Sequence, residues 1–438
     1  MKIFFYTFGC KVNQYETENI KEAFEDKGME VTSETVDADV FVINTCTVTS
    51  QADLKCRQLI RKLRKDSPDG VIVMAGCFAQ AYKEKAEELS ECDIIVGTSC
   101  KEQIPQLVEE YISTGKRIVR IEELRSGSPL SAKNRMNDGK TRAYIKIQDG
   151  CRCFCTYCVI PFARGPLRSK PLEDIFAETR TLVENGHKEI VLTGINLCFY
   201  GKETNAKASF IDAVEAACSV QGDHRVRLGS IEPEMLTDDD IDRLAGLDKL
   251  CPHFHLSLQS GCSETLKRMN RRYTAEQYHE LCKKLRKRFP DCAITTDIMV
   301  GFPMESQEEF ESSLAFAEMI GFAQAHIFPY SRRAGTKADK MSGQVEKAVK
   351  HQRAALMRRV CDKSENEYLC GMVGKTVRVL FERETDPEWH QGHAENYSVV
   401  KVKKSDDRTL WKTFADVKIT SAEKGFCIGE IIQKGRKL

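Results

Sequence analysis

Residues 143–161 read AYIKIQDGCRCFCTYCVIP, in which a short apolar strand leads directly into a cysteine-rich loop. Cys151, Cys155 and Cys158 have the spacing C-x3-C-x2-C. Three thiolates can hold three irons of a four-iron cluster and leave the fourth iron open to a substrate. A zinc site needs paired C-x2-C knuckles or nearby histidines, and none of the 9 His lies near these thiols in sequence. The spacing therefore favours an open iron-sulfur cluster, with zinc or plain buried thiols as the alternatives.

The bulk composition indicates a multidomain protein of a reducing compartment. The chain has 438 residues, a length that corresponds to about two to four domains. Its 19 Cys are odd in number and spread along the whole chain, and no signal cleavage pattern follows the start, so we expect a cytoplasmic protein. No stretch approaches the roughly 18 apolar residues of a membrane span. Because the net charge is +1, a nucleic-acid partner must be met by local basic patches.

The first 120 residues alternate short apolar strands with helices that have polar faces. The strands are KIFFYTF, VFVINT, VIVMAG and IIVGT, with helices that open near Gln14, Ser50, Ala79 and Lys101. This order predicts a doubly wound parallel sheet over residues 1–120. Cys10, Cys46 and Cys77 each follow a strand, where ligands collect in such sheets. We expect these thiols to converge at one edge, although chance placement among 19 cysteines is the alternative.

A polar linker over residues 121–138 precedes a second alternation, which covers residues 139–368. Six strand and helix units predict a partial (β/α)6 barrel, with the clustered thiols just after its first strand. A helix from about Val345 to Cys370 leads out of it. Residues 369–438 show alternating strands without a helical period, which predicts a small all-β barrel. Residues 371–438 carry 13 Lys and Arg against 10 Asp and Glu, a small basic excess that suits RNA.

The motifs together resemble the radical S-adenosylmethionine methylthiotransferases. The resemblance rests on the cysteine loop with an aromatic before its last Cys, and on LTGINL, LGSIEP, HLSLQSG, TDIMVGFP and FPYSRRAGT. It begins with TFGCKVNQYETE, INTCTVTSQAD and AGCFAQ and ends in a β-domain similar to the TRAM domain of RNA-modifying enzymes. It thus covers the whole chain. It implies an α/β fold with an amino-terminal doubly wound sheet, a radical S-adenosylmethionine barrel and a TRAM-like barrel.

The resemblance also implies two four-iron clusters and S-adenosylmethionine as cofactors. One cluster would lie on Cys10, Cys46 and Cys77 and hold the sulfur to be transferred, and the radical cluster would lie on the second triad. One S-adenosylmethionine would methylate that sulfur, and another would be cleaved to a 5′-deoxyadenosyl radical that takes hydrogen from the target carbon. The expected contacts of S-adenosylmethionine are Tyr157, Gly194, Ser257, Gln259, Asp297 and Gly301.

Several of these contacts have a plainer interpretation. Tyr157 is as well explained by packing as by contact with a purine. Gly194 is equally an ordinary glycine at a strand end. Ser257 and Gln259 alternate with Leu on one strand face, as polar residues that line a barrel do.

The substrate depends on the branch of the family. KVNQYETE and TVTSQAD resemble the branch that acts on N6-threonylcarbamoyladenosine, 3′ of the tRNA anticodon. Isopentenyladenosine in tRNA and a ribosomal-protein aspartate are alternative substrates, and a non-catalytic iron-sulfur tRNA-binding protein is the alternative of another class. The expected partners are a tRNA anticodon stem-loop, an electron donor of the flavodoxin or ferredoxin type and a sulfur donor.

A basic helix face after Cys46 points to RNA as well. Arg57, Arg61, Arg64 and Lys65 follow one another at i, i+4, i+7 and i+8. We expect this face to guide the anticodon stem-loop, although a solvated charged face is the plainer interpretation.

Two residues depart from the family pattern. Arg152 stands where the family usually has Asn, and Cys153 is an extra thiol inside the motif. Cys153 is therefore an alternative ligand, but the family spacing selects Cys151.

Overall fold

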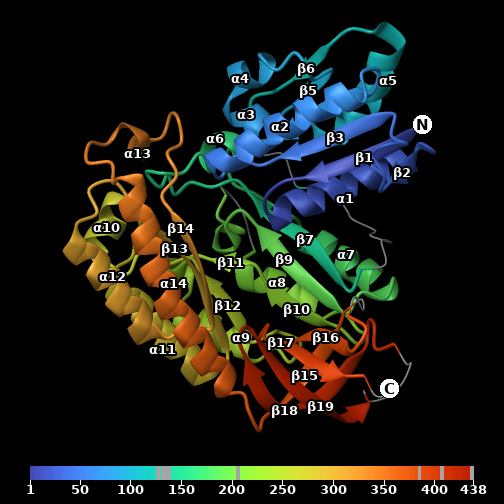
Figure 1. Ribbon diagram of the computed structural model, residues 1–438. Coiled ribbons are helices and arrows are strands. Elements are labelled where there is room, and N and C mark those ends of the chain that lie inside the picture. Colours follow the sequence, from blue (N-terminus) through green and yellow to red (C-terminus); the bar gives the residue numbers. More distant parts are fainter. Residues whose placement is uncertain (125–129, 131–139, 204–207, 383–385, 405–408, 435–438) are drawn as a thin grey trace.

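The computed structural model describes residues 1–124, 130, 140–203, 208–382, 386–404 and 409–434. Most of the expected linker, residues 121–138, lies outside these described residues. Figure 1 shows three bodies: an amino-terminal sheet domain, a strand-and-helix barrel, and a carboxy-terminal β-barrel at the opposite end.

The amino-terminal domain is a doubly wound parallel sheet, as the alternating pattern predicts. Its strand order is β2-β1-β3-β4-β5-β6. Helices α1 and α5 bury Ile20 and Val108 against one face, and α2 to α4 bury Ile60 and Phe78 against the other. The elements are β1 Lys2–Thr7, α1 Lys11–Glu25, β2 Glu30–Thr32, β3 Val40–Thr45, α2 Ser50–Asp66, β4 Val71–Gly76, α3 Cys77–Ala81, α4 Lys83–Glu87, β5 Ile94–Val96, η1 Lys101–Gln103, α5 Ile104–Thr114 and β6 Ile118–Arg120.

The central domain is a partial barrel with six positions for parallel strands, one of which β10 and β11 occupy together. The pairing runs β7-β9-β10 and continues β11-β12-β13-β14, with Gly229 separating β10 from β11. No strand pairing in the described ranges joins β14 back to β7, so the barrel is open at that side. Its strands are β7 Arg142–Asp149, β8 Arg168–Ser169, β9 Glu189–Gly194, β10 Arg225–Leu228, β11 Ser230–Ile231, β12 His253–Leu256, β13 Ala293–Val300 and β14 Gln324–Pro329.

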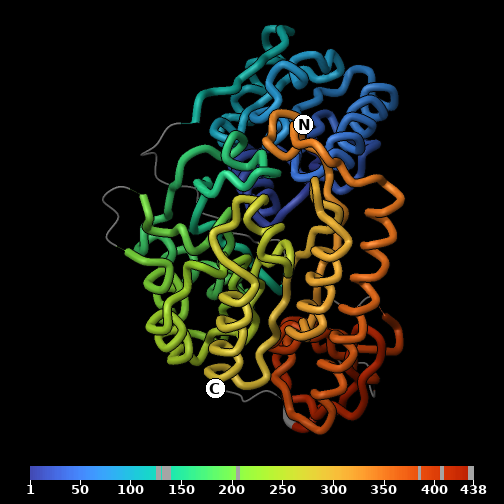
Figure 2. Tube along the Cα trace, turned by 90° about the vertical axis from the view of Figure 1, so that its left-hand side faces the viewer, coloured from blue at the N-terminus to red at the C-terminus, as the bar shows by residue number. Residues whose placement is uncertain are grey.

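Helices pack apolar side chains, among them Ile175, Val214 and Phe310, into one core with the apolar residues of these strands. The helices are α6 Ile160–Arg164, α7 Leu172–Glu184, η2 Leu197–Phe199, α8 Phe210–Cys218, η3 Pro233–Met235, α9 Asp238–Ala245, α10 Ser263–Arg268, α11 Ala275–Arg288, α12 Gln307–Ile320, α13 Lys337–Lys340 and α14 Lys347–Cys370. Figure 2 shows the long helix α14 running from the barrel down to the carboxy-terminal domain.

The carboxy-terminal domain is a closed five-stranded barrel in the order β15-β16-β17-β19-β18. Its strands are β15 Thr376–Phe381, β16 Trp389–Ala394, β17 Val399–Lys403, β18 Phe414–Glu423 and β19 Phe426–Lys434. Val379, Val400 and Val417 are fully buried in its core. Closure leaves no free sheet edge, which suits a small domain.

The flanking domains meet the central barrel from two directions. Helix α1 packs along β7 (Figure 1). At the amino-terminal ends of β9 and β10, Glu189 binds Arg225 and Arg227, with nitrogen to oxygen distances of 2.6 and 2.9 Å. Nη1 of Arg227 also donates to the Glu395 carbonyl at 2.9 Å. The carboxy-terminal barrel is thereby held to the base of the central barrel.

No helix among the described residues is long and apolar enough to cross a membrane.

Candidate active site

The first thiol triad lies at the carboxyl ends of three neighbouring parallel strands. Cys10 follows β1, Cys46 follows β3 and Cys77 follows β4, and the order of the sheet reverses between β1 and β3. Such a reversal is the usual ligand-binding point of a doubly wound sheet. The three thiols lie within electrostatic reach of one another, and burial raises the pKa of the Cys46 thiol to about 11.

Backbone geometry brings these strand ends close together. Gly9 has φ +96°, and a side chain there would come within 2.5 Å of Cβ of Cys46. Asn13 on α1 donates to the carbonyls of Phe8 and Thr45 at 2.8 and 2.9 Å. One side chain therefore joins the segments that carry Cys10 and Cys46.

Two cationic side chains, Arg164 and Lys101, lie near Cys77. Burial raises the pKa of the Cys77 thiol, and the nearby Arg164 and Lys101 act in the opposite direction by favouring the thiolate. Both cations contact the buried carboxylate of Glu16, and Nη2 of Arg164 donates to Asn13 at 2.6 Å. Because cluster ligands are thiolates, this charge distribution fits a set of metal-bound sulfurs.

The second triad lies in the loop after β7, at the carboxyl end of the barrel strands. Gly150 has φ +81°, and a Cβ there would meet the Pro166 carbonyl at 2.0 Å. Nδ2 of Asn270 donates to the carbonyls of Cys153 and Phe154, each at 3.1 Å. The turn after α10 therefore helps to fix the loop, together with the backbone conformation that Gly150 allows.

Charged and polar donors surround the second triad. Nη1 of Arg271 lies 3.5 Å from Sγ of Cys155, and Arg271 is paired with Glu232. The backbone amide of Ile160 donates to Sγ of Cys158 at 3.4 Å. Burial raises the pKa of Cys158 to about 12. Hydrogen bonds to sulfur are among the factors that set the potential of an iron-sulfur cluster.

Cys153 lies between two members of this triad. Its backbone amide donates to Sγ of Cys151 at 3.4 Å, and its thiol interacts with the thiols of Cys151 and Cys155. Hydrogen bonding to Cys151 raises the pKa of Cys153 to about 12. Nδ2 of Asn196 lies 3.8 Å from its sulfur. The extra thiol is therefore buried beside its neighbours, and Cys153 stays the alternative to Cys151 as a ligand.

Across the part of the chain that the structure describes, no three His, Cys, Asp or Glu side chains are grouped closely enough to hold a single metal ion. A four-iron cluster distributes its thiolates over different irons, so its ligands stand farther apart than those of one ion.

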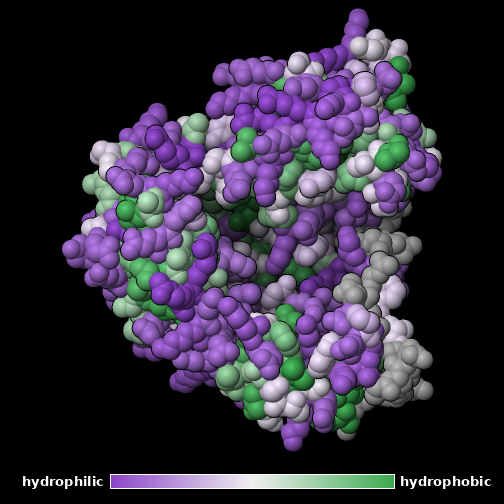
Figure 3. Space-filling model, in the orientation of Figure 1, coloured by the Kyte–Doolittle hydropathy of each residue, from purple (hydrophilic) through white to green (hydrophobic). Residues whose placement is uncertain are grey.

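A cavity of about 600 Å³ lies between the amino-terminal domain and the central barrel. Cys10 and Lys11 line it from the amino-terminal domain, and Gly194 and Asp297 line it from β9 and β13. Figure 3 shows the hollow between the domains on this face. The cavity therefore has one thiol of the first triad and two of the expected S-adenosylmethionine contacts in its wall.

The other expected cofactor contacts lie outside this wall. Tyr157 packs edge to face on Phe302 at 6.4 Å. The backbone amide of Gln259 donates to the Asp297 carbonyl at 2.9 Å, and the backbone amide of Gly301 to Glu305 at 2.7 Å. The carbonyl of Ser257 accepts from Tyr273 at 2.6 Å. Their contacts with S-adenosylmethionine stay predictions.

The cavity also contains residues that the sequence did not single out. His255 pairs with Asp297, with Nε2 and Oδ2 3.4 Å apart, and His326 lies beside it. Tyr397 enters the cavity from the carboxy-terminal barrel, with φ +72°, and its ring lies under the Arg227 guanidinium at 4.7 Å. No sequence motif marks Tyr397, because its position depends on the packing of two domains.

The basic face of α2 divides into two groups. Arg57, Arg61 and Lys65 are exposed, and Arg61 contacts Glu91 at 3.3 Å. Arg64 differs from the RNA-binding expectation because its guanidinium is occupied inside the domain. It donates to the Pro68 and Gly70 carbonyls at 2.7 and 2.9 Å and to Asp93 at 2.5 Å.

Three family profiles match successive parts of the chain. The profile described as "Uncharacterized protein family UPF0004" matches residues 2–97, that of the radical SAM superfamily matches residues 145–317, and that of the TRAM domain matches residues 371–432. The chain is 37% identical over 435 residues to "Threonylcarbamoyladenosine tRNA methylthiotransferase MtaB" of Bacillus subtilis, covering 98% of this chain and 96% of that protein. The chain belongs to the radical S-adenosylmethionine methylthiotransferases. Within this family it lies on the MtaB-like branch.

Two further relatives carry names with two different substrates. The "Threonylcarbamoyladenosine tRNA methylthiotransferase MtaB" of Thermotoga maritima is 38% identical, with 86% of this chain and 85% of that protein covered. A "tRNA-2-methylthio-N(6)-dimethylallyladenosine synthase" from Finegoldia magna is 33% identical, with 97% and 93% covered. The radical S-adenosylmethionine methyltransferase TsrM from Kitasatospora setae has a similar fold, with a TM-score of 0.55, 14% identity, and 74% and 72% covered.

Membership of this family makes the protein an enzyme that uses an iron-sulfur cluster and S-adenosylmethionine. The TRAM domain and the tRNA-modifying relatives likewise indicate that it binds tRNA.

Proposed function

We propose that this methylthiotransferase converts N6-threonylcarbamoyladenosine, 3′ of the tRNA anticodon, to its 2-methylthio derivative. The observation that carries the proposal is the shared cavity, because Cys10 and the barrel lining at Gly194 and Asp297 face the same space. The names of the relatives at 36–38% identity support the choice of substrate.

Two four-iron clusters are part of the proposal. Cys10, Cys46 and Cys77 would hold one, and Cys151, Cys155 and Cys158 the other. When bound, the clusters would supply a transferable sulfur and an electron, and S-adenosylmethionine would be the source of the adenosyl radical. The chain's own contribution is to fix the distance between the two thiol loops, through Asn13 and Arg164.

The remaining partners follow from this chemistry. We propose that a flavodoxin- or ferredoxin-type protein supplies electrons, that a separate donor replaces the sulfur, and that the enzyme works in the cytoplasm. The anticodon stem-loop would contact Arg57, Arg61 and Lys65, which are exposed on α2.

Two measurements test the proposal. Protein reconstituted anaerobically should contain about eight irons per chain, whereas about four would leave the amino-terminal triad without a role. With S-adenosylmethionine, a reductant and tRNA bearing threonylcarbamoyladenosine, it should yield the 2-methylthio nucleoside by mass spectrometry.

The same assay separates the alternatives. The Finegoldia magna relative, named for dimethylallyladenosine, makes isopentenylated tRNA the substrate to run in parallel. A product from that tRNA alone would reject threonylcarbamoyladenosine as the substrate. A product on a ribosomal-protein aspartate, with none on either tRNA, would reject tRNA as the substrate. Failure to release 5′-deoxyadenosine would favour a non-catalytic tRNA-binding protein.

A further inference from the structure

Within the described part of the chain, Lys11 is a cation without an ion-pair partner in the wall of the shared cavity. It is the first residue of α1 and directly follows Cys10. Among the described residues that line the cavity it is the single lysine or arginine. Across all described residues, no hydrogen bond or ion pair reaches its ammonium group.

The surroundings of Lys11 have an excess of positive charge. Arg142 and Arg227 lie within electrostatic reach of it, as does the carboxylate of Glu189. Glu189 is already shared by Arg142, Arg225 and Arg227, at 2.6 to 2.9 Å. Asp297, a carboxylate that does line the cavity, is paired with His255. A partly buried ammonium that is repelled by its neighbours is a binding site for an anionic ligand group.

The position of Lys11 beside Cys10 restricts which anion it can meet. In adenine, C2 and C6 flank N1, so a sulfur placed at C2 lies on the same edge of the ring as the N6 substituent. A base that presents C2 to a sulfur held near Cys10 therefore presents its N6 group to the adjacent residues. The threonylcarbamoyl group ends in a carboxylate, whereas an isopentenyl group is uncharged.

We propose that Lys11 binds the threonyl carboxylate of the substrate base and so selects threonylcarbamoyladenosine over adenosines with uncharged N6 groups. This inference rests on the proposed function. The ligand chemistry is a carboxylate next to a purine, which S-adenosylmethionine also offers through its methionine end, so the test must separate the two sources.

The experiment measures binding of anticodon stem-loop RNAs to the anaerobically reconstituted enzyme by fluorescence anisotropy. One RNA carries threonylcarbamoyladenosine and the other its neutral carboxamide analogue. A charge-assisted hydrogen bond corresponds to about a 10- to 100-fold change in Kd. Lys11→Met should weaken binding of the first RNA by that factor and leave the second unchanged, and Lys11→Arg should retain most of the preference.

Lys21→Met is the matched control. Lys21 is on the same helix, lies outside the cavity wall, and pairs with Glu18 at 3.1 Å. It should bind both RNAs as the unaltered enzyme does. Iron content and circular dichroism of both variants should match the parent, because the Lys11 ammonium group makes no ion pair or hydrogen bond with the residues that the structure describes.

Three results would overturn the inference. An equal loss on both RNAs would place Lys11 on the RNA backbone or in the fold. An unchanged preference would place the carboxylate elsewhere. Weaker binding of S-adenosylmethionine without RNA would make the methionine carboxylate the ligand. If the unaltered enzyme forms the 2-methylthio nucleoside in any of these cases, the proposed function stands and only the role of Lys11 falls.

Discussion

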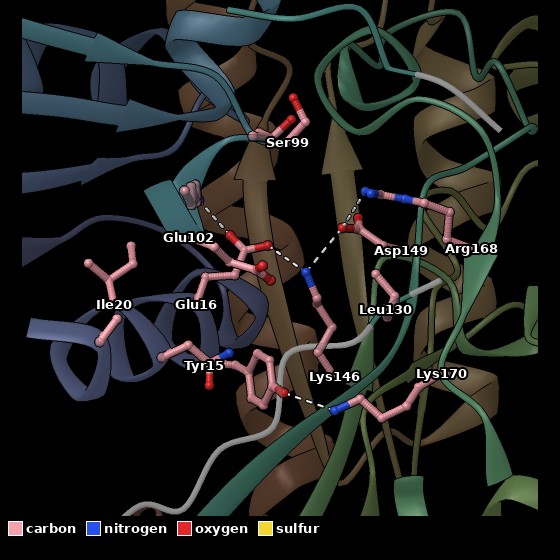
Figure 4. A pocket seen from close by; sticks show the side chains of 14 residues that line it. Tyr15, Glu16, Ile20, Ser99, Glu102, Leu130, Lys146, Asp149, Arg168 and Lys170 are labelled. Carbon is pink, nitrogen blue, oxygen red and sulfur yellow. Dashed lines mark hydrogen bonds and ion pairs between the residues drawn. The ribbon is translucent and has the colours of Figure 1, made fainter. Parts of the chain in front are cut away.

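Replacing Glu16 by Gln should strongly destabilise the contact between the amino-terminal domain and the barrel. Glu16 is on α1, and its carboxylate accepts from Lys101 of the same domain at 2.5 Å and from Lys146 of β7 at 2.8 Å. It also pairs with Arg164, which is fully buried. Figure 4 shows Glu16 and Lys146 joined by their ion pair in the wall of a pocket, whose volume is about 280 Å³. The substitution removes the shared negative charge and leaves the cations in place.

The expected loss in free energy of unfolding follows from the ion pairs that remain after Glu16→Gln. Breaking a buried ion pair by removing one partner costs about 3 to 5 kcal/mol. Asp149 still neutralises Lys146 and Arg168, at 3.1 and 3.0 Å, so we expect the lower end, about 3 kcal/mol. Equilibrium urea unfolding followed by circular dichroism measures the loss.

Glu25→Gln is the control, because Glu25 is exposed on the same helix and surface substitutions usually stay within about 0.5 kcal/mol. If both variants unfolded at the same urea concentration, water would screen the Glu16 cluster and the reasoning would be refuted.

The pH dependence of stability gives an independent check. The neighbouring cations hold the pKa of Glu16 and Asp149 below their usual 4.5 and 3.8, against burial. Their contribution to stability is therefore complete above those values and is lost as the pH falls through the lowered pKa.

Three further predictions concern the site. Cys153→Ala should keep all the iron of the reconstituted enzyme, whereas Cys151→Ala should lose about four irons; iron analysis that gave the reverse would make Cys153 the ligand in place of Cys151. Tyr397→Ala should weaken tRNA turnover and lower stability by about 1 to 2 kcal/mol, since it removes a cation–π interaction; unchanged thermal unfolding would contradict this. Charge reversal at Arg57 and Arg61 should reduce tRNA affinity. The slope of the logarithm of the binding constant against the logarithm of salt concentration should become shallower by about 0.7 to 0.9 for each phosphate that the enzyme no longer neutralises. An unchanged slope would exclude this face as an RNA-binding surface.

The elements with a clear apolar pattern are predictable from the sequence, and those without one are not. VFVINT is expected as a strand and forms β3, Val40–Thr45, because a fully apolar run between turn residues suits a central parallel strand. β16, Trp389–Ala394, cannot be recognised from its sequence, because WHQGHA is polar and contains Gly. The edge strands β2 and β6 have three residues each, too short to show a period.

The candidate site likewise has features that are predictable from the sequence and features that are not. The convergence of Cys10, Cys46 and Cys77 is predictable, because parallel strands must bring their carboxyl ends to one edge. The internal role of Arg64 is not, because its acceptors include backbone carbonyls at Pro68 and Gly70, which any sequence supplies. The cavity residue Tyr397 also escapes sequence analysis, because its place depends on how the carboxy-terminal barrel docks.

Docking of the amino-terminal domain is itself part of the active site. The partial barrel leaves β7 and β14 unpaired with each other within the described ranges, and α1 packs along β7. The same helix begins with Lys11 in the cavity and carries Glu16 among the cations of the barrel. Because little more than one turn of helix separates the two residues, loss of the Glu16 ion pairs should displace Cys10 and Lys11 together. Buried charge between the domains therefore fixes the distance between the proposed sulfur site and the barrel lining, a distance that neither domain can set alone.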